Sequence, residues 1–432
     1  MSKPLVSIVK YQDAYQSVRE AIELCDGLRH LRKDDKILIK PNLLAWDFDL
    51  PYSPFGVIAT SAVVFALVRV LNENGYTKLT IGEGPMALPK PTGRAIYKVL
   101  GYEKLRDQYG VELVDFNEEK FEEVNLGELK LSIAKRALEA DKVINVPVLK
   151  THNQCKISLG VKNLKGCLNR KSKEFCHGKD LDLSYTFPLI AARLPVALTI
   201  IDGVFALEKG PSNTGKAFRK DLLIASTDVL ACDVVGSEIM DYRPADIEHL
   251  RFFAQRTGGS LDLKDIQVVG EDLEKHRQFV DFDWEWTPED TGPVGFAKRG
   301  ITGLAIRKYD SSMCTGCSAN FNSVLILMMS AFKGDPFPGV ELVSGKRQVA
   351  SPGFEKTILY GKCACNLNKD NRNIKKAVPI KGCPPKMEDF IKSLKEEGLD
   401  CSLEAYVAYR HYIHSRYKAE NGFDMGLFGE QQ

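Results

Sequence analysis

Strand-like and helix-like segments alternate through the first half of the chain, and this alternation is the feature that most limits its possible folds. Apolar strand patterns fall at residues 36–40, 78–85, 111–116, 141–152, 196–203 and 221–226. Helical patterns separate them at 60–75, 93–105, 133–140 and 227–240. The pattern predicts an α/β fold, a mostly parallel sheet flanked by helices.

Polar side chains follow several of these strands near their carboxyl ends. They are Lys40, Asn42, Glu83, Lys150, His152 and Asp202. Each alone is typical of a solvated loop, but open α/β sheets bind ligands at the carboxyl ends of their strands. We therefore expect these residues to share one site.

The densest polar stretch runs from residue 145 to residue 168, where lysines stand among glycines and apolar residues. Such lysines can surround a phosphate or carboxylate, and a nearby histidine can act as a general acid or base, although a lone histidine is more often structural. The predicted catalytic residues are Lys150, His152 and Lys162. The predicted ligand-binding residues are Lys40, Asn42, Asn163, Lys165 and Asp202, with Asp202 and Asp233 expected to orient the lysines.

A second glycine-rich stretch, "GPSNTGK" at residues 210–216, resembles a phosphate loop in composition. Ala217 stands where an ATPase loop needs a hydroxyl for Mg²⁺, and the chain continues into a strand pattern rather than a helix. We do not expect an ATPase loop here, although a loop that donates N–H groups to an anion stays open.

The composition changes at residues 279–300, which form an acidic, aromatic stretch rich in Pro and Gly. The predicted division is an α/β substrate- or anion-binding domain at 1–278, a linker or domain crossing at 279–305, and a smaller C-terminal iron–sulfur domain at 306–432.

The third part holds three cysteine motifs: "MCTGC" at 313–317, "YGKCACNLNKD" at 360–370 and "KGCPP" at 381–385. A C-x-x-C turn can supply two of the four thiolates of an iron–sulfur cluster. Zinc sites usually pair two C-x-x-C motifs at shorter spacing, so zinc fits less well. On the pattern alone, iron–sulfur, zinc and unliganded thiols all stay open.

The balance of charges and the sequence of the N-terminus favour a cytoplasmic protein. The chain has 59 basic and 57 acidic residues, which gives no electrostatic reason to expect nucleic acid or an anionic membrane as a partner. The N-terminus lacks the apolar run of a signal peptide. Thiols stay reduced in the cytoplasm, so clustered cysteines indicate metal or redox chemistry. A second metal or cluster near Cys155, Cys167 and Cys176 is a further option, although their spacing matches no standard ligand pattern.

The order "CTGC", "GKCA" and "GCPP" is similar to the proximal-cluster module of nickel–iron hydrogenase small subunits and the related complex I subunit. The resemblance covers residues 310–390 and implies one [4Fe–4S] cluster held by Cys314, Cys317, Cys363 and Cys383. Cys365 departs from that pattern and raises the question of which member of the C-x-C pair binds.

The first part resembles the family of domain of unknown function 362. The matching motifs are "KPNL", "GEGP", "ADKVINVPVLKTH…SLGVKNLKG" and "IDGV…GPSNTGK…LLIASTDVLACDVV", over about residues 5–245. The resemblance implies an α/β core, often with an appended iron–sulfur domain. The lysine and histidine motif also resembles the nickel-pincer lactate racemase family.

Together these features lead us to expect an iron–sulfur-dependent oxidoreductase of anaerobic metabolism, acting as a reductase. A ferredoxin-like donor would supply electrons through the [4Fe–4S] cluster to a small anionic substrate or second cofactor held by the α/β part. Two alternatives stay open: a non-redox isomerase or racemase of small hydroxy acids with a structural cluster, and an iron–sulfur assembly or electron-transfer partner protein. A homodimer is one option for its assembly.

Overall fold

The computed structural model describes residues 3–44, 46, 53–86, 93–212 and 215–429, and the chain divides into two compact units. Unit 1 comprises Met1–Lys173, Ser184–Asp283 and Tyr417–Gln432, and unit 2 comprises Glu174–Leu183 and Trp284–Arg416. This division differs from the predicted 1–278, 279–305 and 306–432 in three places, the first being that residues 279–305 divide between the two units after Asp283. A short segment after residue 173 belongs to unit 2, and the end of the chain returns to unit 1.

Unit 1 is built on a mixed sheet that, within the described residues, has ten strands. Eight follow the order β12-β1-β11-β10-β7-β2-β3-β4, and β8 and β9 extend from β10. The strands are β1 (Leu5–Lys10), β2 (Ile37–Pro41), β3 (Leu79–Glu83), β4 (Glu112–Asp115), β7 (Lys142–Val146), β8 (Val148–His152), β9 (Lys156–Ser158), β10 (Val196–Glu208), β11 (Lys216–Ser226) and β12 (Gln267–Gly270). The run β10-β7-β2-β3-β4 is parallel throughout, which confirms the predicted α/β class and mostly parallel sheet.

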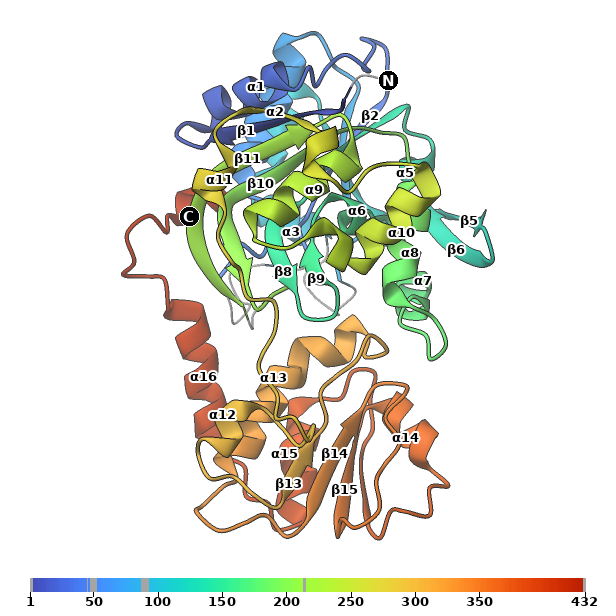
Figure 1. The fold of residues 1–432 in the computed structure, drawn as a ribbon, viewed down its shortest axis with the longest axis vertical. Helices are drawn as coiled ribbons and strands as arrows, with labels where there is room; N and C mark the ends of the chain where they lie inside the picture. The colour runs from blue at the N-terminus through green and yellow to red at the C-terminus, as the bar shows by residue number, and fades with distance from the viewer. Residues whose placement is uncertain (1–2, 45, 47–52, 87–92, 213–214, 430–432) are drawn as a thin grey trace. The chain divides into compact units, whose positions relative to one another are not determined.

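Helices connect and cover these strands (Figure 1). In unit 1 they are α1 (Ala14–Leu24), α2 (Ser61–Glu73), α3 (Gly93–Val99), α4 (Glu103–Tyr109), α5 (Lys135–Leu138), α6 (Gly160–Asn163), α9 (Val229–Ile239), α10 (Glu248–Thr257) and α11 (Leu273–His276). Helix α7 (Arg170–Phe175) runs from unit 1 into unit 2, and α8 (Leu183–Ala191) begins at the last residue of that unit 2 segment and continues in unit 1. A hairpin of β5 (Phe121–Leu126) and β6 (Leu129–Ala134) precedes α5. Among the described residues, no helix is long and apolar enough to cross a membrane.

Three local predictions need correction or completion. The single strand predicted at 141–152 is two strands, because Pro147 lacks an N–H and the chain turns there to pair β8 with the far part of β10. The helix predicted at 133–140 is reduced to α5, because Ile133 and Ala134 end strand β6. Lys216 begins β11, which confirms that a strand follows the 210–216 loop. Asn213 and Thr214 of that loop lie outside the described residues.

Unit 2 contains a parallel sheet in sequence order, β13 (Leu304–Ile306), β14 (Val340–Ser344), β15 (Lys356–Tyr360) and β16 (Ala377–Ile380), which has four strands within the described residues. Its helices are α12 (Val294–Ala297), α13 (Thr315–Ser330), α14 (Lys362–Asn368), α15 (Met387–Glu396) and α16 (Leu403–Ser415). The apolar run after Cys317 forms the second half of α13 and packs against α15 and α16.

The last residues of the chain complete the core of unit 1 with aromatic side chains. Phe428 is fully buried, and its ring centroid lies 5.4 Å from that of Phe55 and 6.0 Å from that of Phe205. Tyr417 accepts a hydrogen bond from the backbone amide of Ala217 at 2.5 Å. These contacts explain why the tail belongs to unit 1, which no local sequence pattern indicated.

Replacing Phe428 with alanine should therefore destabilise unit 1 by about 3–5 kcal/mol, because it leaves a cavity between buried rings. Chemical denaturation followed by circular dichroism would measure this loss. Phe279→Ala is the matched control, since the Phe279 side chain is 59% exposed and its loss should cost less than about 1 kcal/mol. Equal effects of the two substitutions would contradict the structural role of the tail.

Candidate functional site

A buried ion pair joins the carboxyl ends of β2 and β3. Lys40 Nζ lies 2.8 Å from Glu83 Oε2, and both side chains are almost fully buried. Lys40 Nζ also donates to Asn163 Oδ1 at 2.9 Å, and the backbone amides of Leu43 and Gly84 donate to the Glu83 carboxylate at 3.3 and 2.8 Å. A buried ion pair is stable only when its other hydrogen-bonding groups are satisfied, and these contacts satisfy them.

Side-chain amides extend this network to two further elements. Asn163 of α6 donates to Asn145 Oδ1 at 2.9 Å, and Asn42 donates to Asn163 Oδ1 at 2.9 Å. Lys150 of β8 donates to Asn42 Oδ1 at 2.7 Å and to the Val57 carbonyl at 2.5 Å. The structure thus brings the predicted residues of β2, β8 and α6 into one network.

Several lysines crowd around this network, and we call them the lysine cluster: Lys40, Lys150, Lys162, Lys165 and Lys173. Burial, with smaller effects from neighbouring lysines, lowers the pKa of Lys162 and of Lys173 to about 8. Burial also lowers the pKa of Lys150 well below its usual value, with Lys162 and Lys40 adding to the effect.

Among the described residues, the ammonium groups of Lys150, Lys162 and Lys173 contact neutral oxygens. Glu83 pairs with Lys40, whereas Lys173 Nζ donates to the Gly84 carbonyl at 2.6 Å and Lys150 donates to neutral oxygens. Lys162 Nζ lies 3.4 Å from Ser158 Oγ. Desolvated cations among neutral oxygens are stabilised when an anion joins them. The chemistry of the cluster therefore suits an anionic ligand.

The backbone of Gly166 passes directly over the ion pair. A Cβ atom at this position would lie 2.2 Å from Glu83 Oε1 and 2.5 Å from Lys40 Nζ. A Cβ on Gly84 would in turn lie 2.6 Å from the Gly166 carbonyl oxygen. Two glycines therefore allow the loop after α6 to close over the charged pair.

Asp202 and Asp233 contact the backbone at the starts of two helices. Asp202 Oδ2 accepts from the backbone amide and hydroxyl of Thr60 at 2.6 and 2.9 Å, at the start of α2. Asp233 accepts from the amides of Gly160 and Val161 at 2.7 and 2.8 Å, at the start of α6. Burial raises the pKa of Asp202 to about 6 and that of Asp233 to about 7. Their oxygens accept from backbone amides and the Thr60 hydroxyl, so any orientation of the lysines acts through the backbone, and that role stays a prediction.

His152 ends strand β8, two residues after Lys150, so both side chains project from the same side of that strand. The side chain is 8% exposed, and Nδ1 accepts from the backbone amide of Gln154 at 3.1 Å. That bond assigns the ring proton to Nε2 in the neutral imidazole. Its catalytic role stays a prediction.

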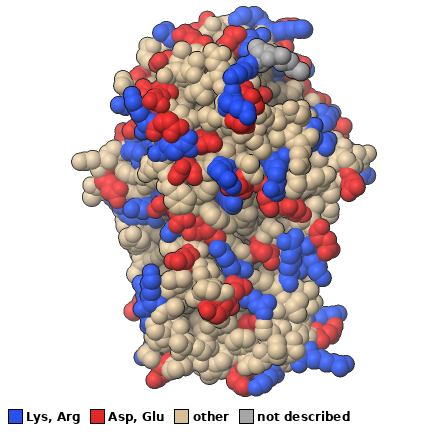
Figure 2. Space-filling model, viewed as in Figure 1, with Lys and Arg blue, Asp and Glu red and all other residues tan. Residues whose placement is uncertain are grey.

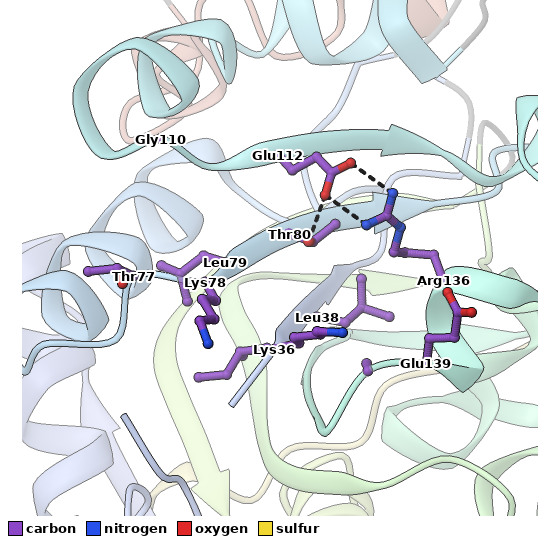
Figure 3. A pocket seen from close by; sticks show the side chains of 12 residues that line it. Lys36, Leu38, Thr77, Lys78, Leu79, Thr80, Gly110, Glu112, Arg136 and Glu139 are labelled. Carbon is purple, nitrogen blue, oxygen red and sulfur yellow. Dashed lines mark hydrogen bonds and ion pairs between the residues drawn. The ribbon is translucent and has the colours of Figure 1, made fainter. Parts of the chain in front are cut away.

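A separate pocket of about 350 Å³ lies at the opposite end of the strands, by the first residues of β2, β3 and β4 (Figure 3). Here Arg136 donates to both carboxylate oxygens of Glu112 at 2.8 and 2.9 Å, and Thr80 Oγ1 lies 3.4 Å from Glu112 Oε2 (Figure 3). Arg136 and Glu112 are thus paired with each other, and this pocket lies away from the carboxyl ends of the strands, where open α/β sheets bind ligands. We therefore take the lysine cluster as the candidate site of unit 1.

In unit 2, three cysteine-bearing segments converge beyond the carboxyl ends of parallel strands. Tyr360 of β15 and Ile380 of β16 are paired in register, and Cys363 and Cys383 each follow three residues later. The two segments are tied together, because the amide of Gly361 donates to the Ile380 carbonyl at 3.0 Å. A second bond joins the amide of Lys362 to the Gly382 carbonyl at 2.9 Å.

The C-x-x-C motif meets these two segments at the start of α13. Cys314 is the N-cap residue of that helix, and Cys317 lies in its first turn. A Cβ on Gly361 (φ +92°) would lie 3.2 Å from Cys317 Sγ, and one on Gly316 would lie 3.4 Å from the ring of Pro384. Glycine at these contacts lets the backbone of one segment approach the thiol of another.

The thiols of these segments act on one another electrostatically. A hydrogen bond between the thiols of Cys314 and Cys317, together with N–H groups at the start of α13, lowers the pKa of Cys314 to about 6. That same bond raises the pKa of Cys317, and the thiols of Cys363 and Cys383 raise it further. Burial raises the pKa of Cys363, and the positive charge of Lys346, which donates to backbone carbonyls of the 174–183 segment, opposes that rise and helps to lower the pKa of Cys314.

Cys365 stands apart from this group. Its thiol donates to the Leu359 carbonyl at 3.4 Å, back along the helix toward β15. Burial raises the pKa of Cys365, and among the thiols only Cys363 contributes to that shift. Cys363, in contrast, is influenced by both Cys314 and Cys383. The geometry of the described residues therefore groups Cys363, not Cys365, with the other three motif cysteines.

In the described part of the chain, no group of three or more His, Cys, Asp or Glu side chains is arranged to bind a metal ion. The chemistry of the four grouped thiols nevertheless suits an iron–sulfur cluster. The other predicted cysteines give less support. Cys155 and Cys167 belong to unit 1 and Cys176 to unit 2, and burial raises the pKa of Cys167 to about 12, which disfavours a thiolate.

Sequence reasoning missed several members of these sites. Lys173 sits in a polar helix pattern where nothing distinguishes it from a solvated lysine. Asn145 offered a signal, since it is an amide within an otherwise apolar strand pattern, and Glu83 was expected at the shared site but its pairing with Lys40 was not predicted. The contact of Gly166 with the ion pair depends on a fold that no local pattern contains.

Comparisons with known proteins give a family and two distant structural similarities. The profile of the family described as "Domain of unknown function (DUF362)" matches residues 37–238. A thylakoid-associated protein of Synechocystis sp. is 32% identical over 286 residues, which cover 65% of this chain and 85% of that protein.

Two solved structures are similar over part of their length. The lactate racemase apoprotein of Thermoanaerobacterium thermosaccharolyticum has 16% identity and a TM-score of 0.32, with 54% of this chain and 57% of that chain covered. A protein of Thermotoga maritima has 14% identity and a TM-score of 0.35, with 57% and 60% covered. The chain thus spans less than two thirds of either protein.

Gly166→Ala should destabilise the protein by about 3–5 kcal/mol, because the added methyl group forces apart the buried pair of Lys40 and Glu83. The free energy of unfolding in guanidinium chloride measures the effect. Gly295→Ala serves as the control, since a Cβ there meets only the end of Arg299 at 3.6 Å and should change stability by less than about 1 kcal/mol. A G166A protein as stable as the control would show that the loop does not clamp the pair.

Proposed function

The chain belongs to the DUF362 family, and from that premise and the two sites above we propose that it is an iron–sulfur oxidoreductase acting on an anionic substrate. Unit 2 holds a [4Fe–4S] cluster on Cys314, Cys317, Cys363 and Cys383. Unit 1 holds an anionic substrate or second cofactor at the lysine cluster. A ferredoxin-like protein supplies the electrons.

The observation that carries this proposal is the convergence of three cysteine segments at one edge of the unit 2 sheet. Four soft thiolate ligands suit iron and sulfide, and glycines beside them leave backbone N–H groups available to the sulfurs. The positive charge of Lys346 near Cys314 and Cys363 favours their thiolate forms. When bound, the cluster supplies a one-electron carrier that side chains cannot provide.

In unit 1 the chain's own residues bind the substrate and handle the proton. Lys150, Lys162 and Lys165 neutralise its anionic group, and the amides of Asn42 and Asn163 fix the orientation of the surrounding side chains. His152 carries its proton on Nε2 and supplies or takes the proton that accompanies electron transfer. The Lys40–Glu83 pair maintains the geometry of the site.

The identity of the thiol ligands gives the first test. Anaerobic purification should yield about four irons and about four sulfides per chain. Cys363→Ser should lose most of this iron and the paramagnetic resonance signal of the reduced protein. Cys365→Ser is the matched control, two residues away, and should retain both. A colourless or zinc-containing wild-type protein, or equal iron loss in the two variants, would contradict the cluster assignment.

The lysine cluster gives the second test, with inorganic phosphate as the probe. Lys162→Met should weaken phosphate binding roughly tenfold, as expected for the loss of a hydrogen bond to a charged group. Binding to the wild-type protein should also weaken as pH rises from about 7 to about 9, because burial sets the pKa values of Lys162 and Lys173 at about 8 and neutral amines no longer attract the anion.

Isothermal titration calorimetry measures both effects. Lys171→Met provides the control, because Lys171 is exposed and lies outside the lysine cluster. Its affinity for phosphate should match that of the wild type at each pH. Affinity that is independent of pH and unchanged in K162M would refute the anion site.

A further inference from the structure

His249 is a buried histidine that the proposed function does not use. It is the second residue of α10, and its side chain is 0% exposed. Among the residues that the structure describes, neither of its ring nitrogens has a hydrogen-bond partner. Burial, with a smaller effect from Lys162, lowers its pKa to about 3, so the ring is neutral and carries one N–H donor and one acceptor nitrogen.

The ring of His249 lies at one end of the lysine cluster. Helix α10 packs against α6, the short helix that carries Lys162. The His249 and Phe187 ring centroids are 5.7 Å apart, edge to face. Lys162 Nζ and Lys165 Nζ lie 5.4 and 5.9 Å from the centroid of the same Phe187 ring. One phenyl ring therefore contacts an imidazole and two ammonium groups.

A buried imidazole without hydrogen-bond partners lowers the stability of the fold at this position. Desolvating a ring N–H and a ring nitrogen without partners destabilises a fold, whereas a phenyl group would occupy the same space at no such cost. The ring lies in the first turn of a ten-residue helix, the end at which the helix dipole is positive, although the amides of Leu250 and Arg251 already donate to the Ile247 carbonyl. A neutral donor, two cations and a helix N-terminus are the groups that bind an oxyanion.

We propose that His249 donates its ring N–H to an oxyanion, a phosphate or carboxylate group, that Lys162 and Lys165 neutralise beside Phe187. This inference rests on the proposed function and deepens it, because it identifies the part of the lysine cluster that recognises the ligand. Two ammonium groups set the charge that is accepted. The neutral imidazole adds a directional bond, which a halide or another spherical anion uses less well.

His249→Phe tests the proposal, because it removes both ring nitrogens and retains the ring against Phe187. Binding of inorganic phosphate is measured by calorimetry, and acetate is used in a parallel arm to separate phosphate from carboxylate recognition. We expect H249F to melt at a higher temperature than the wild type and to bind the preferred oxyanion roughly 10- to 100-fold more weakly, the loss expected for a hydrogen bond to a charged group.

Two controls isolate the role of the imidazole. His30→Phe makes the same change at an exposed histidine and should leave affinity unchanged. In ¹⁵N-histidine spectra, the ring signal that is absent from H249F should shift when the oxyanion is added to the wild-type protein. Chloride at the same ionic strength should shift it less.

The outcomes separate this inference from the function on which it rests. If K162M weakens binding but H249F binds as the wild type does, His249 does not contact the ligand and the inference is wrong while the anion site stands. If neither phosphate nor acetate binds the wild-type protein, the anion site and this inference both fail. If H249F raises the melting temperature and weakens binding, and H30F does neither, the inference is supported.

Discussion

The buried pair of Lys40 and Glu83 is the constraint around which unit 1 is organised. Two charges removed from water are tolerated only with complete hydrogen bonding, and this requirement fixes the ends of β2 and β3, the amide of Asn163 and the path of the loop at Gly166. That loop carries Lys165 and follows the helix that carries Lys162. The ion pair therefore helps to place Lys162 and Lys165.

The protonation of the other buried lysines and carboxyl groups depends on which groups stabilise their charges. Glu83 is already paired, so the other buried lysines have lowered pKa values and are ready to lose a proton or accept an anion. Asp202 and Asp233 receive backbone N–H groups, yet burial raises their pKa values toward neutrality. Folding thus favours protonated forms of these two carboxyls, and their contribution to stability declines as pH rises from about 4 to about 7. The interior of unit 1 keeps an excess of positive charge that suits an anion.

Sequence patterns were sufficient where structure depends on periodicity and insufficient where it depends on contacts between distant segments. Apolar runs identified most strands of the parallel sheet, and strand ends identified Lys40 and Asn42. Pro147 was visible in the sequence, but the break it causes was missed because apolar residues continue on both sides. His249 falls in an ordinary amphipathic helix, and its position beside Lys162 arises only when α10 packs on α6.

Surface charge, in contrast, carries little information about either site. Figure 2 shows lysine and arginine side chains interspersed with acidic ones over the visible face, as the near balance of 59 basic and 57 acidic residues suggests. The functional charges are few and buried, so composition averages them away. The position of polar residues at strand ends is therefore the sequence feature that indicates the site.

The positions of the thiols in unit 2 also depend on where parallel strands end. Parallel strands in register end at one edge, so residues at equal distances after β15 and β16 are brought together. Cys363 and Cys383 share that distance, whereas Cys365 is carried farther along α14 and points back to the Leu359 carbonyl. A C-x-C pair looks equivalent in sequence, but the register of two strands and the direction of one helix make its members different. That difference is why a serine substitution at each position would distinguish the proposed cluster ligand from a packed thiol.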